Sequence, residues 1–405
     1  MIYYIRAIFN RIFKFFDRLT FYFRCGILFS VIIMKAFLRK LIPVEFRFKV
    51  FRIINSIFFA FCRLFPIKNR VFFYTIRADG KLLENSRMVY DALDCEKLIF
   101  AKMLPHPQRI QPKLCFNLLT SRVIVTDDYL RYMRSIRLRN GQKLIQIWHA
   151  GGAFKCFGLD APSKLTPEQE RATHSQYSAV IVTGEDCKKC FADAFGVSEE
   201  ICLPLGLPRT DKLLSESGEM KEAFFKRHPE LRSKKIYLYC PTFRENDGEK
   251  IVFNPGIDWK KLSAELSDDE VFIVKRHPVM DYSLVDAEYG NIFDFSDEST
   301  LELASACDVM ITDYSSVSHD ACLLGKPAVF YCPDYKKYER SFYLKFPDDL
   351  SGELVDDGEK LLEAVRRAQK DPPLDRMEKF RKGQVGACDG HSTERVAGLI
   401  ASWLE

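Results

Sequence analysis

From Val71 onward, short runs of apolar residues alternate with segments of helical periodicity, and this alternation most constrains the fold. Runs of four or five residues are too short for a helix and predict buried strands. Near-continuous apolar strands are typical of a parallel sheet covered on both faces. The expected strands form two series, 71–74, 97–100, 122–126, 143–147 and 179–183, then 235–239, 271–274, 309–312 and 328–331.

The two series predict an α/β protein with two doubly wound, Rossmann-like domains facing a cleft. A chain of 405 residues has room for two such domains and an appendage. We place the boundary in the polar segment 214–234, which separates the series. The expected parts are basic amphipathic helices at 1–68, an N-terminal α/β domain at 69–215, a C-terminal α/β domain at 216–385 and a closing helix at 386–405.

The first seventy residues differ from the rest in charge, with 14 Lys/Arg against 2 Asp/Glu. Between Ile2 and Phe16, apolar side chains share one face of a predicted helix and basic side chains share the other. Uncharged runs in this part reach ten residues, about half of what a spanning helix needs. We expect peripheral attachment to an anionic membrane surface, on its cytoplasmic side. The alternative is a helical hairpin packed on the protein itself.

Other features narrow the function by exclusion. Fifteen of the 34 Phe precede residue 70, which a nucleic-acid-binding arm would not need. The Cys-x-x-Cys of Cys187 and Cys190 has no second pair or histidine at zinc spacing, so we expect no metal site and reduced thiols. Neither a Gly-x-Gly-x-x-Gly nor a Walker motif occurs in the sequence, which gives no support to a dinucleotide enzyme or a P-loop ATPase.

His149 follows the predicted strand 143–147 and precedes Gly151 and Gly152. A lone histidine is more often structural than catalytic. Its place at the carboxyl end of a strand, next to two glycines that let a ligand approach the backbone, favours a functional role.

Three further strand ends carry polar residues in the second series. The tetrapeptide Lys-Arg-His-Pro occurs twice, and the copy with His277 follows a strand, whereas the copy with His228 follows a helical stretch. We therefore expect His277 in the cleft and His228 at a solvated helix end. The Ser-Ser turn after 309–312 could cap a short helix and seat a phosphate. The strand-end residues of this half are Thr242, Arg244, Lys275, His277, Asp313, Ser315 and Ser316.

Together these segments resemble the CDP-glycerol glycerophosphotransferase family, which includes teichoic acid primases and polymerases. The resemblance spans residues 71–350 and implies a GT-B glycosyltransferase-like fold, with the CDP nucleotide held by the C-terminal domain, and membrane attachment by a separate basic segment. We expect the acceptor on the N-terminal domain. The family's Trp-His-Gly reads Trp148-His149-Ala150 here, which leaves the polyol open. The ordered motifs are Trp148-His149, Gly206-Leu-Pro-Arg209-Thr-Asp211, Pro241-Thr-Phe-Arg244, Lys275-Arg-His277-Pro278, Thr312-Asp-Tyr-Ser-Ser316 and Lys326-Pro327.

The resemblance, with the chemistry of the side chains, predicts a role for each residue. His149 would take the acceptor's proton, and His277 would donate to a phosphoryl oxygen or the leaving group. Arg244 and the Ser315–Ser316 turn would hold the pyrophosphate, with Lys275 nearby. The donor set also includes Thr242, Asp313 and, at the ribose, Asp320. The acceptor side or hinge would include Gly151, Gly152, Lys155, Arg209 and Asp211.

We therefore expect transfer of glycerol phosphate, or a related polyol phosphate, from its CDP conjugate to a membrane-linked teichoic-acid-like acceptor, with release of CMP. No tightly bound cofactor is expected, although Mg²⁺ from solution could neutralise the donor. The alternatives are a CDP-ribitol ribitolphosphotransferase, a nucleotide-sugar glycosyltransferase of the same fold and a non-catalytic membrane scaffold. Primase against polymerase activity and the oligomeric state stay open.

Overall fold

The computed structural model describes residues 56–102, 111–161, 165–246, 249–338 and 341–405. The chain divides into two compact units, residues 1–65 and 66–405. In the first unit the description covers 56–65, and residues 56–62 are helical. The amphipathic pattern expected between Ile2 and Phe16 lies outside the described residues. Within the described part, no helix combines the length and the hydropathy needed to cross a membrane.

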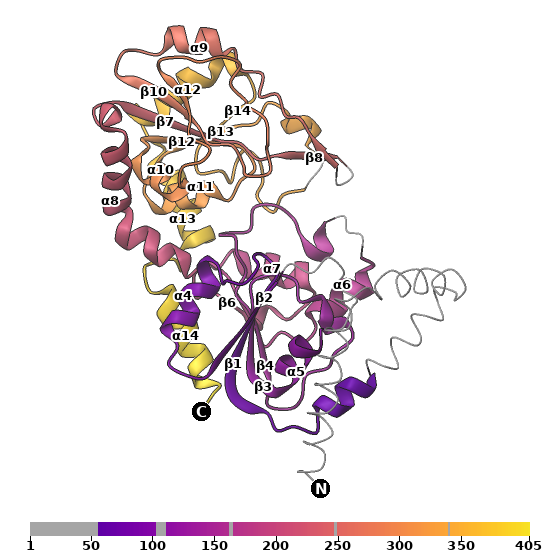
Figure 1. Ribbon diagram of the computed structural model, residues 1–405. Coiled ribbons are helices and arrows are strands. Elements are labelled where there is room, and N and C mark those ends of the chain that lie inside the picture. The colour runs from indigo at the N-terminus through magenta and orange to yellow at the C-terminus, as the bar shows by residue number, and fades with distance from the viewer. Residues whose placement is uncertain (1–55, 103–110, 162–164, 247–248, 339–340) are drawn as a thin grey trace, which may run out of the picture. The chain divides into compact units, whose positions relative to one another are not determined.

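Among the described residues, the first sheet has six parallel strands in the order β2-β1-β3-β4-β5-β6 (Figure 1). The predicted strands of the first series are confirmed, and β6 was not expected. The strands are β1 (Lys68–Thr75), β2 (Lys97–Ala101), β3 (Ser121–Thr126), β4 (Lys143–Gln146), β5 (Ala179–Ile181) and β6 (Cys202–Leu203).

The C-terminal helix returns to the first sheet. Val396 and Ile400 of this helix are buried in one core with Val71 and Val123 of the strands. Figure 1 shows the helix, in yellow, beside α4. The helices of this half are α4 (Glu84–Ala92), α5 (Pro112–Thr120), α6 (Pro167–His174), α7 (Cys187–Phe195) and the returning α14 (Ser392–Ser402).

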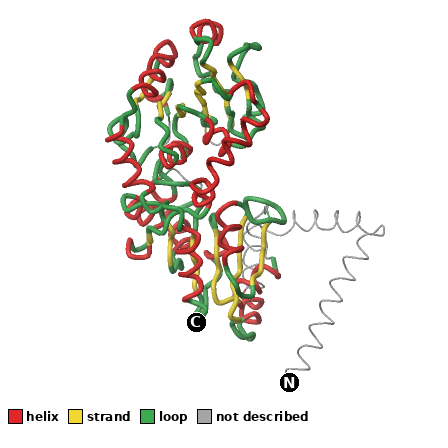
Figure 2. Tube along the Cα trace, turned by 90° about the vertical axis from the view of Figure 1, so that its left-hand side faces the viewer, coloured by secondary structure: helices red, strands yellow, loops and turns green. Residues whose placement is uncertain are grey.

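The second sheet, in the part of the chain that the structure describes, has six parallel strands in the order β11-β10-β7-β12-β13-β14. An antiparallel hairpin, β8 (Arg244–Asn246) with β9 (Glu249–Ile251), is separate from it. The two sets of strands stay apart in both views (Figures 1 and 2). The strands are β7 (Lys235–Cys240), β10 (Glu270–Val274), β11 (Ile292–Asp294), β12 (Val309–Thr312), β13 (Ala328–Tyr331) and β14 (Glu353–Val355).

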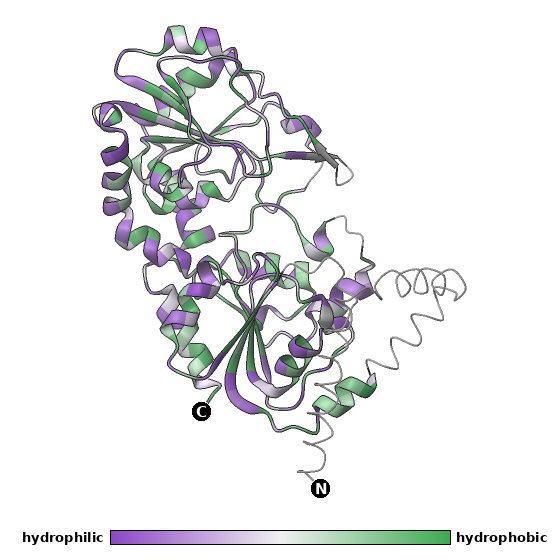
Figure 3. Cartoon of the chain, in the orientation of Figure 1, coloured by the Kyte–Doolittle hydropathy of each residue, from purple (hydrophilic) through white to green (hydrophobic). Residues whose placement is uncertain are grey.

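Helices cover both faces of this sheet. Because successive side chains of a strand point to opposite faces, each strand contributes to two cores. Ile236 and Leu238 of β7 belong to one core, and Tyr237 and Tyr239 belong to the other. Two-sided burial explains the near-continuous apolar runs, which Figure 3 shows in green along the strands. The helices are α8 (Arg209–Arg227), α9 (Trp259–Glu265), α10 (Thr300–Ala306), α11 (Val317–Leu323), α12 (Leu361–Lys370) and α13 (Leu374–Val385).

The polar segment 214–234, in which we placed the domain boundary, is largely helical. Most of it belongs to α8, and Phe224 and Phe225 near the end of that helix are buried in the core of the second sheet. The charged residues occupy the solvated side of an amphipathic helix, which a count of polar residues does not distinguish from a linker.

Strand order reverses once in each sheet. The reversal lies between β1 and β3 in the first sheet and between β7 and β12 in the second. Ligands of open α/β sheets bind beyond the carboxyl ends of strands at such switch points. The residues that follow these strands therefore define the candidate site.

Candidate active site

His149 lies beyond β4, beside the switch point of the first sheet. Its Nδ1 is 2.8 Å from the carbonyl oxygen of Asp127, which follows β3. A carbonyl oxygen can only accept, so Nδ1 carries the proton and Nε2 keeps its lone pair. His149 therefore presents a proton acceptor on its Nε2 side.

Burial lowers the pKa of His149 below its ordinary value, and the positive charge of Arg77 lowers it further. The carboxylates of Asp127 and Asp128 oppose this shift. Burial raises the pKa of Asp127, whose Oδ2 accepts a hydrogen bond from the Ser86 hydroxyl at 2.7 Å. The result is a neutral imidazole at neutral pH, as a general base requires.

Trp148 adopts a left-handed backbone conformation, with φ 50°. Two side chains hold it: Gln146 Oε1 accepts from its amide at 2.9 Å, and Asn85 Nδ2 donates to its carbonyl at 3.1 Å. The indole stacks on the His149 ring, with centroids 4.4 Å apart. Sequence reasoning did not identify Asn85, Gln146 or Asp127, because single amides and carboxylates give no motif.

Gly151 and Gly152 pack against His319 of α11, in the second half. A Cβ at Gly152 would overlap the imidazole of His319, and the residue has φ +65°. The sequence indicated glycines that admit a ligand. The structure adds a packing reason, since a buried histidine fills the space where a side chain would stand.

Lys155 follows this turn and pairs with Phe342 in an isolated antiparallel bridge. Its Nζ lies 5.5 Å from the centroid of the Tyr338 ring. The segment after His149 therefore reaches residues of the C-terminal half.

Arg244 lies at the second switch point, with a side chain only 5% exposed. Its guanidinium is 2.8 Å from Asp313 and 2.6 Å from Asp334. Burial alone would lower the pKa of Arg244, but the two carboxylates outweigh it and hold this pKa above its ordinary value. Arg244 thus joins the ends of β12 and β13, and its predicted contact with pyrophosphate stays a prediction.

Thr242 and Asp313 are also joined, because the Thr242 amide donates to both carboxylate oxygens of Asp313, at 2.9 and 3.1 Å. Lys275 donates from Nζ to the carbonyl of Ser296, and burial lowers its pKa. These contacts fix the loops after three neighbouring strands, β10, β7 and β12.

His277 has the opposite proton arrangement to His149. The Val279 amide donates to His277 Nδ1 at 3.2 Å. An amide only donates, so Nδ1 is the acceptor and the neutral ring holds its proton on Nε2. Burial, followed by the charge of Lys155, lowers the pKa of His277. Lys155 comes from the first half, so residues of both halves share this electrostatic environment.

The Ser315–Ser316 turn precedes α11 as predicted. Ser315 Oγ accepts from the Val317 amide at 3.4 Å, and Ser316 occupies the N-cap position without a side-chain cap. Both oxygens of Asp320 are bonded to Arg209, so the predicted ribose contact stays a prediction.

Asp211 caps α14 by accepting from the amides of Ser392 and Thr393, at 3.0 and 2.7 Å. Arg209 and Asp211 therefore connect α8 with α11 and α14, respectively.

His228 does lie at a helix end, but the expectation that it is solvated is wrong. Its ring stacks on Phe295 with centroids 4.5 Å apart, and its Nε2 is 3.2 Å from Glu298. The side chain is 19% exposed. Packing against a residue about 70 positions away cannot be seen in the tetrapeptide itself.

Over the described ranges, no group of three His, Cys, Asp or Glu side chains could hold a metal ion. Twelve cysteines of the described part are free thiols, including Cys187 and Cys190.

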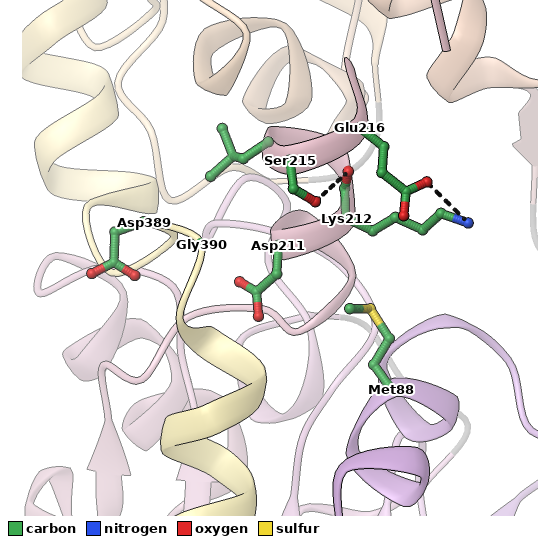
Figure 4. A pocket seen from close by; sticks show the side chains of 8 residues that line it. Met88, Asp211, Lys212, Ser215, Glu216, Asp389 and Gly390 are labelled. Carbon is green, nitrogen blue, oxygen red and sulfur yellow. Dashed lines mark hydrogen bonds and ion pairs between the residues drawn. The ribbon is translucent and has the colours of Figure 1, made fainter. Parts of the chain in front are cut away.

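A pocket of about 430 Å³ lies apart from these histidines. Figure 4 shows Asp211 and Lys212 of α8, Met88 of α4 and Asp389 around it. Its lining lacks the histidines and the serine turn, so it is not the predicted active site.

The profile of the family described as CDP-Glycerol:Poly(glycerophosphate) glycerophosphotransferase matches residues 68–402. The chain belongs to this family. It is a transferase of the CDP-polyol phosphotransferase type, as the ordered motifs predicted.

Relatives within the glycerophosphotransferase family carry both polyol names. The chain is 31% identical over 393 residues to a teichoic acid ribitol-phosphate primase of Bacillus spizizenii, covering 92% of this chain and 99% of the relative. It is 30% identical over 305 residues to a teichoic acid glycerol-phosphate primase of Bacillus subtilis, covering 72% and 76%. A teichoic acid poly(ribitol-phosphate) polymerase of Bacillus spizizenii is 30% identical, and the match spans 57% of its length.

The fold of the chain is similar to that of the wall teichoic acid polymerase TagF. The TM-score is 0.69 at 21% identity, covering 89% of this chain and 97% of that chain. The predicted architecture of two parallel-sheet α/β domains of GT-B type is confirmed.

Proposed function

We propose that this chain transfers glycerol phosphate or ribitol phosphate from a CDP-polyol to a membrane-linked, teichoic-acid-like acceptor. The observation that carries the proposal is the complementary proton state of two histidines. His149 offers an unprotonated Nε2 beside the first switch point, and His277 offers an Nε2–H donor beyond β10. Transfer of a phosphoryl group to a hydroxyl needs one proton acceptor and donors for developing charge.

In the proposed reaction, the acceptor hydroxyl attacks the phosphorus next to the polyol. A new P–O bond forms to the acceptor, and the bond to the CMP oxygen breaks. The hydroxyl proton goes to His149 Nε2. His277 Nε2–H donates to a phosphoryl oxygen or to the departing CMP, and the positive charge of Lys155 near His277 favours the developing negative charge.

The released nucleotide identifies the donor: CMP from a CDP-polyol, or the nucleoside diphosphate from a nucleotide sugar. The purified protein is incubated with CDP-glycerol, CDP-ribitol and nucleotide sugars, each with a lipid-linked acceptor. We expect turnover with a CDP-polyol. Turnover with a nucleotide sugar alone would favour the glycosyltransferase alternative, and release from none would favour the scaffold.

Histidine variants test the roles. His149→Ala and His277→Ala should each lower turnover by about 100-fold or more, roughly 2.7 kcal/mol in the barrier. His149→Ala should keep CDP affinity, because the residue belongs to the acceptor side. His391, whose side chain is 69% exposed, is a better control than the packed His228. A folded His149→Ala enzyme with parental turnover would refute the base.

The donor assignment rests on the strand ends of the second half. Calorimetry with CDP on Ser316→Ala and Arg244→Ala should show losses of about 1–3 kcal/mol. Arg244→Ala also removes the partner of two carboxylates, so melting curves must accompany it. Parental affinity in both folded variants would remove the pyrophosphate assignment.

We also propose peripheral attachment at the cytoplasmic face of the membrane through the basic first seventy residues. Their 14 basic side chains favour an anionic leaflet. Release from membranes by alkali is expected, whereas resistance to alkaline extraction would mean that the chain spans.

A further inference from the structure

Trp148 has a backbone conformation that needs outside support. A non-glycine residue at φ 50° is strained and persists only where its surroundings hold it. Gln146 binds its amide, and Asn85 binds its carbonyl. The turn that leads into His149 is therefore clamped on both sides by side-chain amides.

The conformation of Trp148 sets the place of the next residue. The His149 ring stacks on the Trp148 indole, and its Nδ1 reaches the carbonyl of Asp127. The indole in turn stacks on Phe157, with centroids 5.2 Å apart. A change in the Trp148 backbone would turn the imidazole away from Asp127 and redirect Nε2.

Asn85 is suited to this clamp because both of its polar atoms are used. It is 2% exposed, its Nδ2 donates to Trp148, and its Oδ1 accepts from the Arg209 amide at 2.9 Å. A carbonyl and an amide as partners fix which atom is which. Ser86, the next residue of α4, holds the Asp127 carboxylate. Two successive buried residues thus bind Trp148 and Asp127, the two residues that the imidazole contacts.

We propose that Asn85 is a positioning residue, which fixes His149 as the base and links it through Arg209 to the second half. Arg209 binds Asn85 through its amide and Asp320 of α11 through its guanidinium. The inference rests on the proposed function, because it assigns the base to that reaction.

Asn85→Asp tests the proposal selectively. The carboxylate keeps the acceptor for the Arg209 amide but places an oxygen, without a donor hydrogen, against the Trp148 carbonyl. We expect kcat to fall about tenfold or more at saturating donor, since small misplacements are costly. The Kd of CDP should stay within about threefold, because the hydrogen bonds of Asn85 join it to Trp148 and Arg209 and not to the strand ends of the donor half.

Asn291→Asp is the matched control. This amide also uses both atoms, donating to Ser263 O at 2.8 Å and accepting from Ser263 Oγ at 2.7 Å, at the other sheet. Its kcat should remain parental. An equal fall of kcat in both variants, or an equal loss of CDP affinity in Asn85→Asp, would show a general structural effect and overturn the proposal.

A second measurement does not depend on activity. NMR titration of His149 should give a pKa below the ordinary value in the parent, because it is buried and faces Arg77, with Asp127 and Asp128 opposing. In Asn85→Ser, which is too short to reach Trp148 and adds no charge, the pKa of His149 should move toward about 6.5 as the ring leaves this environment. This variant also serves for the kcat test if Asn85→Asp fails to fold.

The outcomes separate the two proposals. A parent that releases no CMP from any CDP-polyol refutes the proposed function, and the titration still decides whether Asn85 orients His149. An active parent with unchanged kcat and unchanged His149 pKa in the folded variant refutes the positioning role alone.

Discussion

Arg209 and Asp320 form a bidentate ion pair, with Nη2–Oδ1 at 2.9 Å and Nη1–Oδ2 at 3.2 Å. Their side chains are 12% and 8% exposed. The pair joins the first residue of α8 to α11, which follows the Ser315–Ser316 turn. It therefore contributes to holding the predicted phosphate seat in place.

Breaking this pair on one side should be strongly destabilising. Asp320→Leu leaves a buried guanidinium without its partner, which costs about 3–5 kcal/mol, whereas adding Arg209→Leu should recover part of the loss. Urea unfolding measures both. Arg87→Leu, which removes an exposed i,i+4 pair with Asp91, is the control and should change little. Parental stability in Asp320→Leu would contradict the buried pair.

As the pH is lowered, turnover should fall only at a pH below the ordinary pKa of histidine. The base acts when neutral, and burial with Arg77 lowers the pKa of His149, so activity is lost as pH falls through that lowered value. Arg77→Gln removes a positive charge, which should raise the pKa of His149 and move the acid limb of kcat to higher pH. Arg87→Gln on the surface of α4 should leave the limb in place. A limb that stays fixed in Arg77→Gln would contradict this electrostatic coupling.

The strands were predictable because burial on both faces leaves few polar positions. β7 supplies Ile236 to one core and Tyr237 to the other, so the run is apolar throughout. The sequence therefore predicted where each such strand ends, and that His149 and His277 follow strand ends.

The partners of the site residues were not predictable. Asn85 looks like an ordinary residue in the first turn of a helix, and its role depends on Trp148 and Arg209, 63 and 124 positions away. Arg244 was predicted to hold pyrophosphate, yet one of the carboxylates that bind it, Asp334, lies 90 positions downstream. Such pairings follow from strand order, which periodicity alone does not specify.

His319 should make the fold sensitive to acid. It is fully buried between the rings of Phe154 and Phe380, and burial lowers its pKa to about 4. Between about pH 6.5 and 4 the unfolded ring binds a proton and the folded ring does not, so stability falls by about 1.4 kcal/mol per pH unit from this group. Below about 4 the loss levels off.

His319→Gln removes this titration. Its unfolding free energy should depend on pH less steeply than that of the parent over this range. The difference in slope corresponds to at most one proton taken up on unfolding. Identical slopes in the parent and the variant would mean that His319 is not buried in its neutral form. Urea unfolding at several pH values gives the comparison.

Gly152 and Gly218 should respond in opposite ways to the same substitution. In Gly152→Ala the new methyl group meets the His319 ring, and the backbone has φ +65°, so overpacking and strain add to a loss of about 2 kcal/mol or more. The turn that carries His149 should shift with it, and turnover should fall. Gly218 lies in the exposed middle of α8 with open space around its Cβ position, so Gly218→Ala should stabilise by about 0.5–1 kcal/mol with parental activity. Thermal or urea unfolding with CMP release measures both variants. A Gly152→Ala protein with parental stability would mean that His319 can move aside and that the two halves do not meet rigidly at this turn.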